Sequence, residues 1–284
     1  MSEALPSWAT VNGSRLLLAL DWTDLPQGKK MLSLSVPSRG RALPVHLRVV
    51  DERRMWKSQN NLEEGLIKEL LTLLPLGTKP VLLADRGSGR TRLMQQLKTW
   101  GVSFVLRVQG VAMVRSHGRK HRLRAIPLRR GQTVWLRRVL YRDEAPVEVN
   151  VVLTWRRRMK ESWTLVTDLE EPPHAIIAFY GRRMQIEESF RDTKSVRWGF
   201  RFRHVRLSTC ERYERLMMVL VLAYLFLMAV GAQAERDGQH RRLMANTVRY
   251  RTLSWFTVGR ACLRDYVASL ATCVRLLRPT LVQL

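Results

Sequence analysis

One stretch of the sequence combines residue types suited to metal-dependent phosphate chemistry. Residues 180–194 read Tyr-Gly-Arg-Arg-Met-Gln-Ile-Glu-Glu-Ser-Phe-Arg-Asp-Thr-Lys. On an α-helix at about 100° per residue, four polar residues fall within a sector of about 60°: Tyr180, Arg183, Glu187 and Lys194. A carboxylate binds divalent cations and its basic neighbours bind phosphate oxygens. The alternative is a solvated face carrying an ion pair between Arg183 and Glu187, four residues apart.

Two further carboxylates follow short apolar runs that are typical of buried strands. Asp21 ends residues 15–21, and Asp85 ends residues 81–85. Asp24 is a rival for the first position, but we expect it in the turn before Pro26. Asp85 has the alternative role of capping the helix that follows Gly89. Three carboxylates supply hard oxygen ligands, which favour Mg²⁺ or Mn²⁺ over zinc.

The elements that must position these acids follow from the periodicity of the chain. Residues 15–21, 30–36 and 43–50 predict three antiparallel strands joined by Pro- and Gly-containing turns. Asn60 and Glu63 resemble a capping box at the start of a helix that ends near Leu74. A strand over 81–85, a helix over 91–100 and a strand over 102–108 come next. The pattern predicts an α/β fold with a mixed sheet flanked by helices, whose first part spans residues 1–109.

The alternation of predicted strands and helices stops after residue 109. Residues 134–141, 147–155 and 163–167 predict strands separated by basic turns, so we expect a β-rich insertion over residues 110–170. Residues 171–206 contain the helix that completes the core, and residues 207–284 form a helical C-terminal region. Helices are predicted over 173–194, 209–233 and 257–277. On the first of them, Glu188 points away from the polar face at about 80°.

The charge of the chain indicates a polyanionic partner. The 284 residues carry a net charge of +25, with basic clusters at 117–124, 156–160 and 201–206. Such an excess costs self-repulsion, and clusters of this kind neutralise nucleic-acid phosphates. A ribosome-associated or membrane-surface protein is the alternative that charge alone leaves open.

Three sparse cysteines at 210, 262 and 273 argue against a disulfide framework and indicate the reducing cytoplasm. The first residues lack the order of a signal peptide. The apolar run from Leu216 to Val230 is shorter than the ~20 residues a spanning helix needs. We therefore predict a buried core helix there, no membrane association, and a cytoplasmic protein that associates with the nucleoid when bound to DNA.

The candidate functional residues also resemble the signature of a known family. Tyr180, Arg183, Glu187 and Lys194 are separated by two, three and six residues, and this matches the Tyr-Arg-Glu-Lys signature of one branch of bacterial insertion-sequence DDE transposases. Residues 20–23 resemble the family's first-acid segment. Residues 83–87, Leu-Ala-Asp-Arg-Gly, resemble its second.

The resemblance implies an RNase H-like fold in which Asp21, Asp85 and Glu187 meet and hold two Mg²⁺ or Mn²⁺ ions. It implies metal-dependent cleavage of transposon-end DNA and strand transfer into target DNA. Tyr180, Arg183 and Lys194 would then bind DNA phosphates. It further implies a homodimer on double-stranded DNA, and one insertion tryptophan that stacks on an extruded base. The candidates for this last role are Trp135, Trp155 and Trp163.

The sequence departs from the family in two places. Family members usually carry an N-terminal recognition domain, and with the first acid at position 21 we expect that domain to be lacking. Ser88 stands where the family often has an aromatic residue. Two alternatives therefore stay open: a catalytically silent DNA-binding remnant, and an RNase H-like nuclease that cuts without joining.

Overall fold

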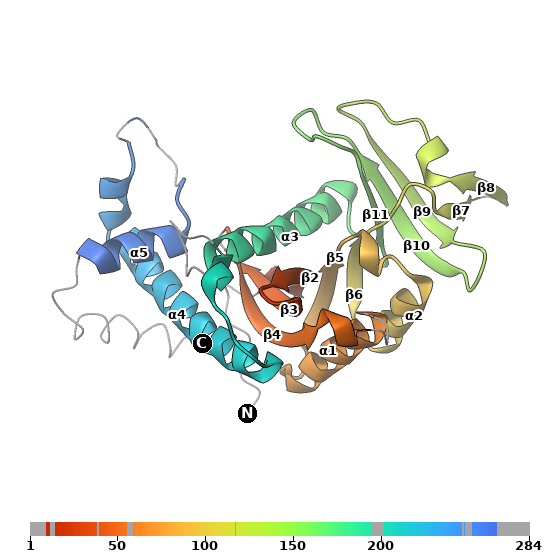
Figure 1. Cartoon of the computed structure of the whole chain (residues 1–284). Helices are drawn as coiled ribbons and strands as arrows, with labels where there is room; N and C mark the ends of the chain where they lie inside the picture. Colours follow the sequence, from red (N-terminus) through yellow and green to blue (C-terminus); the bar gives the residue numbers. More distant parts are fainter. Residues whose placement is uncertain are drawn as a thin grey trace.

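The computed structural model describes residues 10–11, 15–38, 40–55, 59–116, 118–194, 202–245, 247 and 252–265. Its strands form one 11-stranded sheet in the order β4-β3-β2-β5-β6-β11-β10-β9-β7-β8, with β1 beside β2 (Figure 1). The strands are β1 (Thr10–Val11), β2 (Arg15–Leu25), β3 (Lys29–Ser38), β4 (Arg41–Asp51), β5 (Lys79–Ala84), β6 (Ser103–Arg107), β7 (Met113–Ser116), β8 (Arg119–Arg122), β9 (Thr133–Tyr141), β10 (Val147–Thr154) and β11 (Trp163–Thr167). The helices are α1 (Gln59–Leu73), α2 (Thr91–Thr99), α3 (Pro173–Lys194), α4 (Cys210–Arg236) and α5 (Trp255–Asp265).

The first part of the sheet has the predicted order of elements. Strands β2, β3 and β4 are antiparallel, and β5 and β6 run parallel to β2. Strand β2 is longer than predicted and includes Asp24, because its pairing with β3 continues to a turn in which Gln27 and Gly28 have positive φ. The predicted α/β fold class, a mixed sheet flanked by helices, is confirmed.

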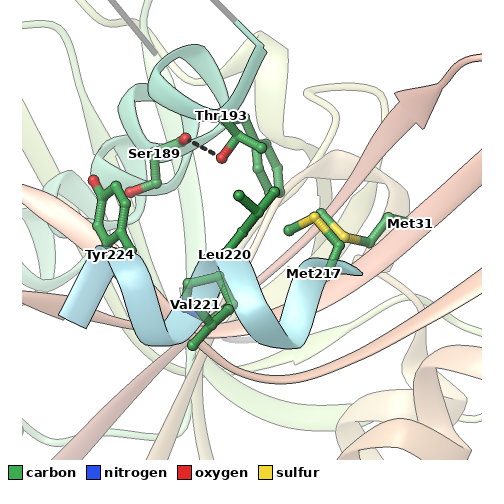
Figure 2. Close-up of a pocket in the computed structure, with 9 residues that line it drawn as sticks. Met31, Ser189, Thr193, Met217, Leu220, Val221 and Tyr224 are labelled. Atoms are coloured by element: carbon green, nitrogen blue, oxygen red, sulfur yellow. Dashed lines mark hydrogen bonds between the residues drawn. The ribbon is translucent and has the colours of Figure 1, made fainter. Parts of the chain in front are cut away.

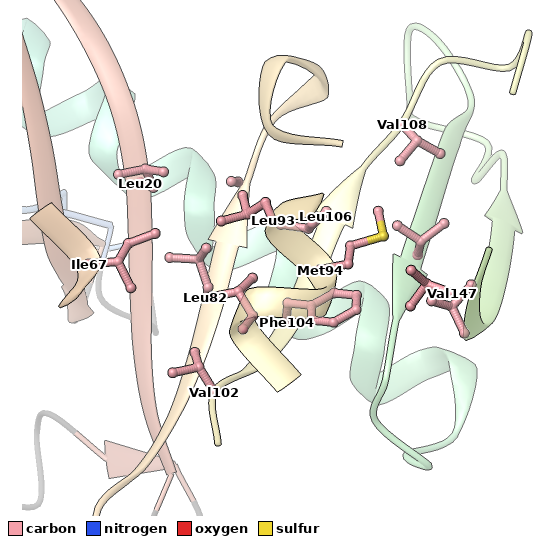
Figure 3. Close-up of a cluster of buried hydrophobic side chains, with 14 of the residues drawn as sticks. Leu20, Ile67, Leu82, Leu93, Met94, Val102, Phe104, Leu106, Val108 and Val147 are labelled. Carbon is pink, nitrogen blue, oxygen red and sulfur yellow. The ribbon is translucent and has the colours of Figure 1, made fainter. Parts of the chain in front are cut away.

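Helices cover both faces of this part of the sheet. On one face, α1 and α2 pack on the alternate residues of the central strands, including Leu20, Leu82 and Phe104 (Figure 3). On the other face, α3 packs on Leu17, Leu83 and their neighbours. Burial on both faces explains why β2 and β5 are continuous apolar runs rather than alternating ones. Asp21 follows the apolar run within β2, and Asp85 follows the last residue of β5.

The β-rich region continues the same sheet. Strand β11 pairs antiparallel with β6, and β10 and β9 extend it outward. The three predicted strands are confirmed. Strands β7 and β8 were not predicted, because all four residues of β8 are exposed and basic and so give no alternation of apolar and polar residues. The boundaries at residues 109, 170 and 206 remain predictions.

The C-terminal helices pack on each other and on the edge strand β4. A Cβ atom at Gly259 would lie 1.8 Å from the backbone oxygen of Leu227, so the two helix backbones touch at a glycine. Among the described residues, α4 is one helix whose length and composition would suit a membrane span. It buries Tyr213, Met217 and Tyr224 and exposes Met218, Val219 and Leu222. The part of the predicted last helix beyond residue 265 lies outside the described residues.

Candidate active site

The two aspartates lie side by side because of strand register. Strands β2 and β5 are parallel, and Leu20 is paired with Ala84. Asp21 and Asp85 are the next residues after this pair, so both carboxylates lie where the parallel pairing of β2 with β5 ends. Each accepts a hydrogen bond from the following backbone N–H, at 3.0 Å for Asp21 and 2.7 Å for Asp85. Asp24, the rival for the first position, instead lies 4.0 Å from Lys30.

Helix α3 brings Glu187 to this point together with a buried guanidinium. Arg183 is 3% exposed. Its Nη2 lies 3.0 Å from Asp21 Oδ2 and 3.8 Å from Asp85 Oδ2, and its Nη1 lies 3.4 Å from Glu187 Oε1. The structure therefore joins all three predicted acids through one cation. Glu188 pairs with Arg191 at 2.8 Å, away from this cluster, as its helical angle predicts.

The electrostatics of the cluster reflect burial and mutual contact. Burial raises the pKa of Asp21, and this outweighs the lowering by Arg183. For Arg183, burial opposes the charged form, but the carboxylate of Asp21 and the other nearby acids raise its pKa overall. Arg183 therefore stays charged, and it neutralises part of the acidic charge around it.

Tyr180 and Lys194 flank the acids on the same helix. The Tyr180 hydroxyl donates a hydrogen bond to Asp85 Oδ1 at 3.4 Å, and burial raises the pKa of this phenol. Its ring meets that of Trp163 edge to face, with centroids 5.0 Å apart. Lys194 Nζ donates to Thr23 Oγ1 at 2.5 Å, two residues beyond Asp21. All four residues of the predicted polar face therefore lie against or beside the acid-bearing strands.

The C-terminal half of α3 is fixed to β4 and α4 by polar contacts. Arg41 Nε donates to Asp192 Oδ2 at 2.5 Å, and the Tyr224 hydroxyl donates to the same oxygen at 3.1 Å. The Ala42 N–H donates to Ser189 Oγ at 2.7 Å. Figure 2 shows the apolar contacts beside them, around a cavity of about 20 Å³ between α3 and α4. These contacts fix the position of the helix that carries Glu187 and Lys194.

One open cavity adjoins the acids, and a second open cavity lies next to the first. The first, of about 290 Å³, is lined by Asp85, Tyr180, Arg183, Glu187 and Trp163, among others. The second, of about 470 Å³, is lined by Trp155 and several arginines. Arg107 and Glu161 line both. Of the three candidate tryptophans, Trp163 is the one beside the acids. Trp135 instead packs against the core with the Arg137 guanidinium over its ring.

An ion-pair cluster between these cavities was not predicted from the sequence. Glu161 Oε2 lies 2.7 Å from Arg86 Nη2, and its Oε1 lies 2.7 Å from Arg107 Nη2. Both arginines lower the pKa of Glu161, and the Arg107 hydrogen bond is the largest cause. Arg86 follows Asp85 directly, so the sequence already indicated that it lies beside a candidate acid. Glu161 had no such signal, because its loop leads into β11, whose pairing with β6 could not be anticipated.

The donor set of the cluster suits a hard divalent cation, because it consists of carboxylate oxygens alone. Its present arrangement does not form a metal site: in the described part of the chain, no three His, Cys, Asp or Glu side chains are grouped to hold an ion. The carboxylates are instead organised around Arg183. We expect ion binding to require this guanidinium to withdraw from between them.

The chain belongs to the family described as Transposase DDE domain, whose match spans residues 45–226. Assignment to the DDE transposases is therefore confirmed, whereas the Tyr-Arg-Glu-Lys branch and the lack of a recognition domain remain predictions. Family membership implies nuclease and transesterase chemistry, and DDE transposases generally use divalent metal ions.

A cryo-EM structure of a piggyBac transposase synaptic complex with hairpin DNA is similar, with a TM-score of 0.46 and 11% identity. The alignment covers 96% of this chain and 58% of that one, so the present chain spans little more than half of its length. No curated protein matches the chain.

Proposed function

We propose that the protein is a DNA transposase that cleaves transposon-end DNA and joins the freed end to target DNA. The observation that carries the proposal is the meeting of Asp21, Asp85 and Glu187 around Arg183 at one sheet edge. In a family defined by such an acid triad, three separated segments converging on one point indicate a common chemical task. The substrate is double-stranded DNA.

Asp21, Asp85 and Glu187 would hold two Mg²⁺ or Mn²⁺ ions. Such ions, when bound, stabilise the entering and leaving oxygens of an in-line displacement at phosphorus. The chain's own residues orient the DNA: Lys194 supplies a cation beside Asp21, and Tyr180 supplies a phenol beside Asp85. Arg183, which contacts all three carboxylates, would supply a further cation for a DNA phosphate at this site.

The basic surface supports DNA as the substrate. All residues of β8 are exposed, and Arg124, Arg129 and Arg130 follow on the same exposed stretch. Clustered cations of this kind bind the DNA backbone irrespective of sequence. We propose further that the protein acts in the cytoplasm and as a homodimer on paired DNA ends.

The test is cleavage of labelled DNA bearing transposon ends, with Mg²⁺ or Mn²⁺, by the wild type and by Glu187→Gln. We expect a loss of more than about 100-fold in the variant, since even outer-shell partners of metal ligands contribute ~10–100-fold. DNA binding should be retained. Glu188→Gln is the matched control, because that neighbour pairs with Arg191 away from the acids.

The products separate the proposal from its alternatives. Joined products identify a transposase, and cleavage without joining identifies a nuclease. Binding of DNA without metal-dependent cleavage by the wild type identifies a silent remnant and overturns the proposed activity.

A further inference from the structure

Glu63 on α1 is a buried carboxylate outside the acid cluster, with three donors around it. It is 4% exposed. Its Oε1 accepts from the Trp22 indole N–H at 2.9 Å, and its Oε2 accepts from Arg90 Nη1 at 2.7 Å and Ser88 Oγ at 3.3 Å. The predicted capping-box role for Glu63 is wrong, because these contacts direct the side chain into the protein rather than to the start of its helix.

The three donors belong to the segments that follow the two aspartates. Trp22 comes directly after Asp21, and its backbone N–H donates to the Asp21 carboxylate. Ser88 lies in the short helical turn after Asp85, and its backbone N–H donates to the Asp85 carbonyl oxygen at 2.9 Å. Glu63 therefore bridges two segments that are far apart in sequence: the part of β2 that follows Asp21, and the short helical turn that follows Asp85.

The bridge is also balanced in charge. A buried carboxylate is costly unless it is paired and hydrogen-bonded, so its partners are held firmly in place. Arg90 supplies the cation, and its side chain is only 16% exposed. The indole and the hydroxyl satisfy the remaining acceptor capacity. Movement of either segment would leave the buried Glu63 carboxylate short of a hydrogen bond, which is unfavourable.

We propose that Glu63 is a positioning residue that fixes the spacing between Asp21 and Asp85 through Trp22 and Ser88. It touches neither reacting atom nor metal ligand, and it acts through these two segments. Trp22 is the partner on the Asp21 side of the bridge, and Ser88 and Arg90 are the partners on the Asp85 side. The inference rests on the proposed function, because spacing of the aspartates matters only if they bind ions together.

The test compares Glu63→Gln with the wild type and with Glu69→Gln. Glu69 lies on the same helix and pairs with Arg48 and His46, but its side chain is 44% exposed. The first measurement is amide hydrogen exchange without metal. Glu63→Gln should accelerate exchange in residues 20–23 and 85–90 together, whereas Glu69→Gln should leave both segments unchanged.

The second measurement is the Mn²⁺ concentration needed to raise the melting temperature and to support cleavage. We expect that concentration to rise by about 10–100-fold in Glu63→Gln, the range found for outer-shell partners, with DNA affinity unchanged. Unaltered exchange and an unaltered Mn²⁺ requirement in a folded Glu63→Gln protein overturn the proposal.

If Glu63→Gln does not fold, Ser88→Ala and Trp22→Phe each remove one arm of the bridge and report the same quantities. We expect either one to raise the Mn²⁺ requirement, and no change in both overturns the inference. A wild type that neither binds Mn²⁺ nor cleaves DNA refutes the proposed function instead. In that case the hydrogen-exchange data still decide whether Glu63 couples residues 20–23 to residues 85–90.

Discussion

The two halves of the sheet use charge in opposite ways. Around β2–β6, three cations that are paired with carboxylates are withdrawn from solvent: the side chains of Arg183, Arg41 and Arg90 are 4%, 16% and 16% exposed. In the half built from β7–β11, paired arginines such as Arg137 and Arg138 are 59% and 72% exposed. Buried pairs lose much if one partner moves, whereas exposed pairs are screened by water and salt. In the first half, therefore, buried ion pairs fix the positions of side chains. In the second half, exposed cations can attract a charged partner.

The largest effect that would test this contrast is expected from Arg183→Gln. It leaves three clustered carboxylates without their cation, so we expect the free energy of unfolding to fall by about 1.5–3 kcal/mol, the range for hydrogen bonds to charged groups. Added Mg²⁺ or Mn²⁺ should reverse part of the loss, because ions replace the missing charge. Chemical denaturation with and without metal measures both quantities.

Arg182→Gln is the control for that change, because Arg182 is the neighbouring residue on α3 and is exposed. It should alter stability little. Equal losses in the two variants, or a loss in Arg183→Gln that metal does not reduce, would contradict the view that Arg183 stands in for a metal ion.

A middle-sized effect is expected from the double change Arg122→Gln and Arg124→Gln in the exposed basic stretch. If both side chains contact phosphates, the plot of log affinity against log salt should become shallower by about 1.8, or 0.9 per contact. DNA affinity should fall for all sequences alike, while the rate of cleavage of fully bound DNA stays the same. A changed cleavage rate at saturation would mean that the two halves of the sheet are not separate in their roles.

The smallest effect is expected from Arg137→Gln, which breaks an exposed pair with Glu170. Exposed pairs of this kind are screened by water and salt and add little to stability, so thermal unfolding should change little. A loss as large as that of Arg183→Gln would show that exposure does not distinguish the two kinds of charge in this protein.

The sequence was most informative where chemistry and periodicity coincided. The bounds of α3 were predicted as residues 173–194, because one helix carries both the polar face and an apolar stripe. Asp21 and Asp85 were found because each ends a run that is buried on both sides. That these two acids meet was expected only from the family resemblance, and the parallel pairing of β2 with β5 is what places them side by side.

What could not be predicted depends on contacts between distant segments. Nothing local shows that Glu63 reaches Trp22 and Ser88, since the three residues meet only when α1 packs beneath the sheet edge. The same holds for Glu161 with Arg107. Arg183 was assigned to phosphate from its residue type, but its position among three carboxylates depends on how α3 lies across the strands. The roles of the site residues remain predictions.

The antiparallel pairing of β11 with β6 also bears on how the protein is made. On the ribosome, chains emerge from the N-terminus and tend to fold in that order. Asp21 and Asp85 emerge early, but Glu187 follows the whole β-rich region, which must first return to β6 before α3 can cross the sheet. The acid triad is thus completed only after that region is synthesised and paired. A nascent chain therefore carries the exposed basic residues of β8 before its three acids have come together.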